Sequence, residues 1–132
     1  MTDWSEAAGY FTTDAVAHLA TIGKDGGPRT VPLWVDRHGE RDLVIFTEEG
    51  SVKDRNIARD PRVALSVTVP GNPLSHASVR GEVVERLEGE RGLEVVDQIS
   101  KAYTGEPYPM REGLVAFVIR PTSWVAHDYS EE

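Results

Sequence analysis

The feature that most limits the fold of this chain is a series of short apolar runs separated by glycine- and proline-containing turns. Runs typical of strands cover residues 17–22, 30–36, 42–47, 62–69, 77–85, 114–120 and 123–128. Only one longer helical pattern, residues 88–103, interrupts them. A parallel sheet needs a helix between successive strands, so this order predicts a mainly β (α+β) fold with six to seven antiparallel strands in a barrel and a few short helices.

Single residues set further details of the expected fold. Pro32 cannot donate a ladder hydrogen bond, so its strand should lie at a sheet edge or a bulge. Gly81 indicates a bulge or bend in its strand. We expect a turn at residues 36–39, one or two short helices within residues 4–16, and Pro121 as a break between the last two strands.

Residues 51–62 are the strongest candidate for a binding site. The basic residues in this segment are Lys53, Arg55, Arg59 and Arg62, in a chain whose formal net charge is -8. A helix predicted to begin after Ser51 adds free N–H groups that favour a phosphate. The alternative is a solvated basic helix, capped by Ser51 and paired to Asp54, which the charge pattern alone favours.

Length and composition narrow the classes of protein to which the chain can belong. A length of 132 residues predicts one domain over residues 1–132, and residues 130–132 are expected to form a frayed tail. The acidic charge argues against nucleic-acid or anionic-membrane partners, and the absence of cysteine excludes disulfides and thiolate metal sites. Without a signal peptide or a spanning apolar run, we expect a cytoplasmic protein. The histidines lack metal-ligand spacing and no catalytic motif is present, so no metal site is expected and the catalytic residues are unknown.

Four motifs, taken in order, carry a resemblance to a known family. They are AHLATIGKDGGPRTVPLW (residues 17–34), KDRNIARDPRV (53–63), YTGEPYP (103–109) and RPTSW (120–124). Over nearly the whole chain the sequence resembles the pyridoxamine 5′-phosphate oxidase-like superfamily. More narrowly, it is similar to the branch that uses the deazaflavin coenzyme F420 in place of flavin mononucleotide (FMN).

The resemblance implies a split β-barrel homodimer with two cofactor sites at the subunit interface. The cofactor-binding residues that it implies are Val31, Pro32, Leu33, Trp34, Thr47, Ser51, Lys53, Arg55, Asn56 and Trp124. Within this set, Lys53, Arg55 and Asn56 would bind the phosphate or acidic tail, with Arg59 or Arg62 assisting. The strand of residues 31–34 would lie against the cofactor ring, bordered by residues 45–47 on a neighbouring strand.

Some of these assignments have structural alternatives. Many relatives carry another basic residue near the position of Ser51, so Ser51 is as much a helix cap as a ligand. Trp34 fits the core or a dimer interface as well as it fits a ring wall. Trp124 and Tyr108 are candidates for closing the pocket from the other subunit, although interface packing is the favoured interpretation for Tyr108.

The function implied by the resemblance is hydride transfer from a reduced deazaflavin to a small electron-poor organic substrate. The alternatives are an FMN-binding reductase or oxidase of the same family and a non-catalytic F420 carrier. A vitamin B6-phosphate oxidase proper is disfavoured, because the short acidic segment after Trp124 lacks the basic residues needed for a substrate phosphate.

Overall fold

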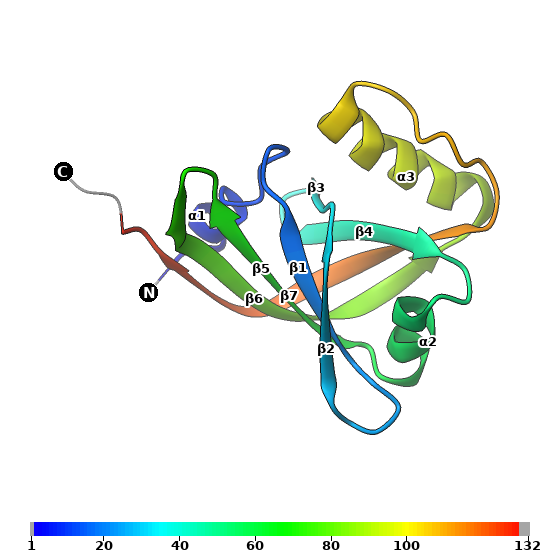
Figure 1. The fold of residues 1–132 in the computed structure, drawn as a ribbon, viewed down its shortest axis with the longest axis horizontal. Coiled ribbons are helices and arrows are strands. Elements are labelled where there is room, and N and C mark those ends of the chain that lie inside the picture. Colours follow the sequence, from blue (N-terminus) through cyan, green and yellow to red (C-terminus); the bar gives the residue numbers. More distant parts are fainter. Residues whose placement is uncertain (1, 130–132) are drawn as a thin grey trace.

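The computed structural model describes residues 2–129, which fold as a split β-barrel of antiparallel strands (Figure 1). The strands are β1 (Ala17–Ile22), β2 (Pro28–Leu33), β3 (Asp36–His38), β4 (Asp42–Glu48), β5 (Arg62–Val69), β6 (Asn72–Leu87) and β7 (Leu114–His127). The helices are α1 (Trp4–Ala8), α2 (Val52–Arg59) and α3 (Gly89–Thr104). The described strands form one sheet in the order β2-β1-β5-β6-β7-β4-β3. The predicted fold class is confirmed, while the tail predicted at residues 130–132 lies outside the described residues.

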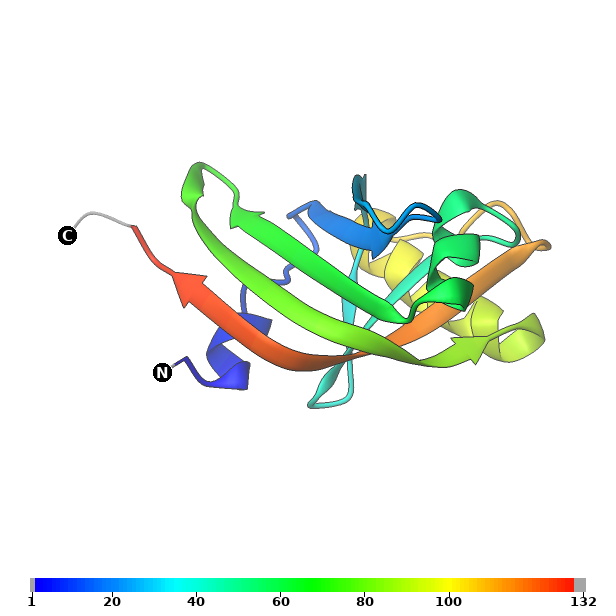
Figure 2. The same ribbon diagram turned by 90° about the horizontal axis from the view of Figure 1, so that it is seen from below.

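Strands β5, β6 and β7 run side by side as a strongly curved band (Figure 2). The curvature turns one face of the sheet inward around the main core, to which Leu19, Leu65 and Phe117 contribute. A second, smaller core lies between α3 and the outer face of β4 and β7, with Val44, Ile99, Val118 and other residues. Both faces of β4 and of the first half of β7 are therefore buried, which explains why these sequences are continuous apolar runs rather than alternating ones.

Helix α3 begins and ends close to the positions that its pattern predicts. Gly92 lets the helix approach β6, because a Cβ there would collide with the carbonyl of Leu87. The helix ends at Gly105, which adopts the left-handed conformation (φ 82°) and donates its N–H to the carbonyl of Lys101 at 2.8 Å. The chain then turns back toward β7.

Pro32 and Gly81 behave as predicted. Strand β2, which contains Pro32, pairs only with β1 and forms one edge of the sheet. The pairing of β6 with β7 shifts register at Gly81, whose missing side chain leaves room for the carbonyl of Arg120.

Three sequence-based expectations about local structure are wrong. Residues 36–38 form the short strand β3 instead of a turn, because they pair with the start of β4 and only residues 39–41 turn. Pro121 does not break β7, since it falls at the register shift opposite Gly81, where a missing N–H is tolerated. Strand β4 is not a sheet neighbour of β2, because it lies between β7 and β3.

Candidate functional site

Two hollows lie beside α2, the helix predicted to hold a phosphate. We call the first the aromatic cavity; it has a volume of about 430 Å³. Its lining residues are Leu33, Trp34, Phe46, Thr47, Glu48, Ser51, Lys53, Tyr108 and Leu114. We call the second the basic groove; it has a volume of about 1070 Å³ and lies between α2 and the β1–β2 hairpin. Its lining residues are Gly23, Lys24, Asp25, Gly27, Pro28, Arg29, Val52, Arg55, Asn56, Ala58 and Arg59.

The start of α2 is fixed by a cap that includes a lining residue of the aromatic cavity. The Asp54 N–H donates to Oγ of Ser51 at 3.2 Å, so Ser51 is the N-cap, as predicted. The Ser51 hydroxyl also shares a 3.0 Å hydrogen bond with Oγ1 of Thr47. The Gly50 N–H donates to the Asp54 carboxylate at 2.8 Å, which closes the turn between β4 and α2.

Asp54 also connects α2 to the sheet. Its buried carboxylate forms an ion pair with Arg86 of β6, whose guanidinium lies over the Phe117 ring at 5.7 Å from the centroid. Burial by itself raises the pKa of Asp54, but the hydrogen bonds from Arg86 and the Gly50 N–H outweigh it and hold that pKa below its ordinary value. Asp54 is therefore a charged anchor that keeps α2 beside the two hollows.

Asn56 is the second anchor of α2. Its side chain is only 2% exposed, and its amide nitrogen donates to Oγ1 of Thr21 on β1 at 3.0 Å. Its amide oxygen accepts a 2.8 Å hydrogen bond from Arg59. Asn56 thus lines the basic groove with an amide whose two ends are already engaged.

The basic groove gathers charge from two elements. Lys24 and Arg29 come from the β1–β2 hairpin and Arg55 from α2, and within residues 2–129 none of the three forms an ion pair. Arg62 differs, because it forms an ion pair with Asp60 at 2.7 Å and the hydrogen bonds from Arg62 lower the pKa of Asp60 to about 2. Asp25 also lines the groove, where it accepts the Gly27 N–H, but the basic side chains outnumber it, so the groove offers an excess of positive charge to an anion.

Aromatic side chains form the wall of the other hollow. Trp34 stacks on Tyr103 with ring centroids 5.0 Å apart and an interplanar angle of 10°. The Tyr103 hydroxyl donates to the Ala15 carbonyl at 2.9 Å, and burial raises the pKa of Tyr103. Tyr108 meets Phe46 edge-on at 4.9 Å and Trp34 at 6.5 Å. Together these rings make an apolar wall that can pack against a planar ligand.

The structure separates the predicted site residues into groups. Those that line the aromatic cavity are Leu33, Trp34, Thr47, Ser51 and Lys53. Arg55 and Asn56 line the basic groove, on the other flank of α2. Val31 packs against the main core, and Pro32 is exposed on the edge strand.

Trp124 lies apart from both hollows of its own chain. Its indole N–H donates to the Thr2 carbonyl at 2.9 Å, and its ring meets Trp4 edge-on at 5.1 Å. Leu114 of the aromatic cavity lies at the other end of β7, roughly 30 Å away along an extended strand.

Interface packing was the favoured interpretation for Tyr108 and stays a prediction; within one chain Tyr108 lines the aromatic cavity. Phe46 was predicted only as part of residues 45–47, which were expected to border the cofactor ring. Of these residues, Ile45 points into the main core and Phe46 into the cavity. The available signal for Tyr108 was its position between Pro107 and Pro109, which marks an ordered loop.

In residues 2–129, no group of three or more histidine, aspartate or glutamate side chains is arranged to hold a metal ion. None of the helices in the described part of the chain is long and apolar enough to cross a membrane.

Comparisons with known proteins agree on one family. The family model for pyridoxamine 5′-phosphate oxidase matches residues 5–128. An F420 reductase superposes with a TM-score of 0.80 and 28% identity, covering 95% of this chain and 98% of its own. Among curated proteins, the search found no match.

Two further solved structures are similar in fold. A conserved hypothetical protein from Mycobacterium tuberculosis has a TM-score of 0.78 and 24% identity, covering 97% of this chain and 86% of its own. A putative pyridoxamine 5′-phosphate oxidase from Listeria innocua has a TM-score of 0.63 and 22% identity, covering 84% of this chain and 86% of its own.

Proposed function

Because this chain belongs to the pyridoxamine 5′-phosphate oxidase family, a family of flavin- and deazaflavin-binding oxidoreductases, we propose that it is a coenzyme F420-dependent reductase. The observation that carries the proposal is the pairing of an aromatic cavity with a basic groove on the two flanks of α2. A cofactor that joins a planar ring to a phosphate and an acidic tail needs both kinds of surface. The 28% identity to an F420 reductase over nearly the full length supports the same cofactor class.

The residues of the aromatic cavity fit the planar end of such a cofactor. Trp34, Phe46 and Tyr108 supply apolar ring surface, and Lys53 supplies a half-buried positive charge at the start of α2. In the described residues Lys53 has no ion-pair partner, so its charge is available to a phosphate. The first N–H groups of α2 favour an anion at the same place.

The residues of the basic groove fit the acidic end. Lys24, Arg29 and Arg55 carry more positive charge than a single phosphate needs, which favours the acidic tail of F420 over FMN. In this proposal Asn56 supports the wall of the groove rather than binding the cofactor directly, since its amide already binds Thr21 and Arg59. FMN is the second candidate cofactor, because the family model itself describes a pyridoxamine 5′-phosphate oxidase.

When bound, the reduced deazaflavin supplies a hydride for an electron-poor double bond or a similar acceptor. The chain's own part is to hold the ring and the anionic tail and to exclude water from the aromatic cavity. The basic residues also disfavour cofactors that lack an anionic group, because their charges would then be desolvated without a partner.

The proposal is tested by titrating F420 and FMN separately into the wild type and into the variant Lys53→Ala with Arg55→Ala. We expect F420 to bind more tightly to the wild type and the double variant to lose about a hundredfold in affinity, since each charged hydrogen bond contributes on the order of 1.5 kcal/mol. The matched control is Arg37→Ala with Arg91→Ala, which removes the same charge outside both hollows. Equal affinities of wild type and double variant would exclude the assigned site, and tighter FMN binding would favour the second candidate.

We also propose that the protein is a homodimer in which Trp124 of a second copy closes the cofactor site. The distance of Trp124 from its own aromatic cavity supports this arrangement, as does the resemblance of the chain to a family of homodimers. A mixture of Trp124→Ala chains and Lys53→Ala chains should recover binding in the mixed dimers, since each mixed dimer carries one intact site. Sedimentation analysis together with cofactor titration measures both properties, and a monomeric wild type would refute the arrangement.

A further inference from the structure

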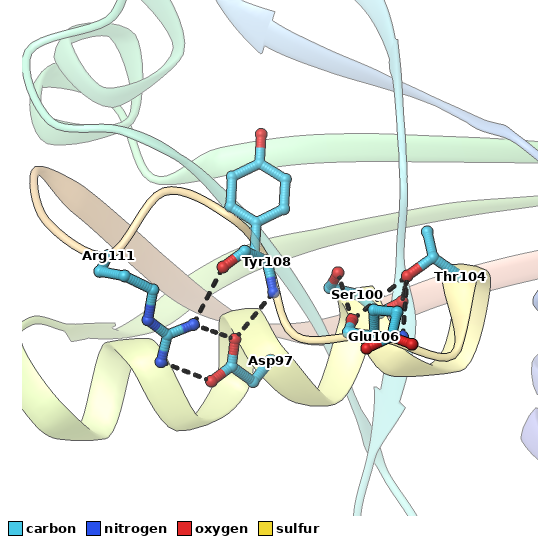
Figure 3. A network of polar contacts seen from close by, with 6 residues as sticks. All are labelled: Asp97, Ser100, Thr104, Glu106, Tyr108 and Arg111. Carbon is cyan, nitrogen blue, oxygen red and sulfur yellow. Dashed lines mark hydrogen bonds and ion pairs between the residues drawn. The ribbon is translucent and has the colours of Figure 1, made fainter.

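The loop from Gly105 to Gly113 is tied to α3 along its length (Figure 3). At its start, the Ser100 hydroxyl donates to the Glu106 carbonyl at 2.8 Å. The Thr104 hydroxyl donates to the Ser100 carbonyl at 2.8 Å and accepts from the Glu106 N–H at 3.1 Å. The chain therefore reverses sharply after α3 and runs back beside the helix.

Asp97 of α3 holds the middle of this loop. Its Oδ1 accepts the Tyr108 N–H at 3.1 Å and an Arg111 N–H at 2.8 Å, and its Oδ2 accepts a second Arg111 N–H at 2.9 Å. Arg111 also donates to the Tyr108 carbonyl at 3.0 Å. Pro107 and Pro109 have no N–H, so that of Tyr108 is the only backbone donor in residues 107–109, and Asp97 binds it.

Arg111 stabilises the charged form of Asp97. The hydrogen bonds from Arg111 are the largest influence and, with the Tyr108 N–H, they hold the pKa of Asp97 below its ordinary value although burial opposes them. The acceptor of the Tyr108 N–H is therefore an ionised carboxylate at neutral pH, which makes the hydrogen bond stronger than one to a neutral acceptor.

The side chain of Tyr108 points away from this network. Figure 3 shows its ring on the opposite side of the loop from Asp97, and there it lines the aromatic cavity against Phe46 and Trp34. Within the described residues the Tyr108 hydroxyl makes no hydrogen bond, so the ring is placed by its backbone and by edge contacts alone. One wall of the cavity is thus held from outside, by a residue of α3 that does not line it.

We propose that Asp97 is a positioning residue, which fixes the Tyr108 ring in the wall of the aromatic cavity and thereby sets the affinity of that cavity for planar ligands. The part of this proposal that concerns ligand affinity rests on the proposed function, whereas the part that concerns the position of Tyr108 does not. Arg111 contributes to this positioning, because its two hydrogen bonds orient the Asp97 carboxylate toward the loop.

The test compares Asp97→Ala with Asp97→Asn, which keeps an oxygen acceptor for the Tyr108 N–H. Nuclear Overhauser contacts between the Tyr108 and Phe46 rings in the cofactor-free protein report on the position of the Tyr108 ring, and titration with F420 and FMN reports on the cavity. We expect Asp97→Ala to weaken these ring contacts and to weaken binding of the better cofactor about tenfold, with Asp97→Asn in between. The control is Arg91→Ala, also on α3, which breaks an exposed ion pair with Glu85 and should change neither measurement.

A double-mutant cycle separates positioning from a general loss of structure. If Asp97 acts through the Tyr108 ring, Asp97→Ala has no further effect on affinity in a Tyr108→Ala background. Full additivity, or unchanged binding in Asp97→Ala, would overturn the proposal. If the wild type binds neither cofactor, the proposed function fails, and the ring contacts then decide the positioning role alone: loss of the Tyr108–Phe46 nuclear Overhauser contacts in Asp97→Ala supports it and unchanged contacts refute it.

Discussion

The two hollows beside α2 are built in different ways. The basic groove takes its charges from two segments, the β1–β2 hairpin and α2, and most of these side chains are exposed. The aromatic cavity takes its rings from Trp34, Phe46 and Tyr108, which come from three separate segments and are held by packing and by α3. Changes in the cavity should therefore affect folding as well as binding, whereas changes to the exposed charges of the groove should affect binding alone.

The largest effect is expected for Trp34→Ala in the aromatic cavity. The substitution removes the stack on Tyr103 and the edge contact with Tyr108, and should lower the free energy of unfolding by about 3 kcal/mol. Cofactor affinity should fall as well, measured by titration after urea unfolding has established the stability. The control is Phe11→Ala, which empties part of the main core at a similar cost in stability without touching the cavity. A Trp34→Ala protein as stable as the wild type would contradict the claim that the cavity is part of the core packing.

A smaller effect is expected at Asp54, which anchors the helix shared by both hollows. Asp54→Asn should lower the free energy of unfolding by about 2 kcal/mol near neutral pH, because a charged hydrogen-bond acceptor of Arg86 and Gly50 is lost. The folded-state pKa of Asp54 lies below the ordinary value of 3.8, so its contribution is complete above that value and is lost as the pH falls through the folded pKa. Urea unfolding over a pH series should therefore show the wild type and the variant converging in acid.

Asp60→Asn is the comparison for this experiment. Asp60 has a lowered pKa of about 2 but belongs to a surface ion pair with the exposed Arg62, so its removal should have a smaller effect over a similar pH range. A constant difference between wild type and Asp54→Asn at every pH would show that the lost interaction does not depend on the charge of Asp54.

The sequence was sufficient for features that depend on local pattern. The antiparallel character of the strands, the cap at Ser51 and the edge position of Pro32 each follow from the alternation or the chemistry of short segments. Strand β3 was missed because its pairing with β4 is a tertiary contact, which the sequence of three polar residues does not indicate. The continuity of β7 through Pro121 was missed for a similar reason, since it depends on a register shift against Gly81.

The sequence likewise predicted only part of the candidate site. Lys53 and Arg55 stood out as charges in an acidic chain, but the sequence could not show that each of them lines a separate hollow. The role of Asn56 as a buried anchor depends on Thr21, which lies 35 residues earlier. Tyr108 enters the cavity only because α3 and the following loop fold back along each other, a contact that no short motif encodes.

The smallest effect is expected for Arg29→Ala in the basic groove. Arg29 is exposed and in the described residues has no ion-pair partner, so its removal should leave the free energy of unfolding nearly unchanged. It should weaken cofactor binding about threefold at low ionic strength, and the difference should vanish near about 1 M salt, where exposed charges are screened. Arg37→Ala removes the same charge away from the groove and should have no effect on binding. The loss caused by Trp34→Ala should persist at high salt, because it arises from packing. If the effect of Arg29→Ala also persisted there, the two hollows would not differ in the way that their lining residues indicate.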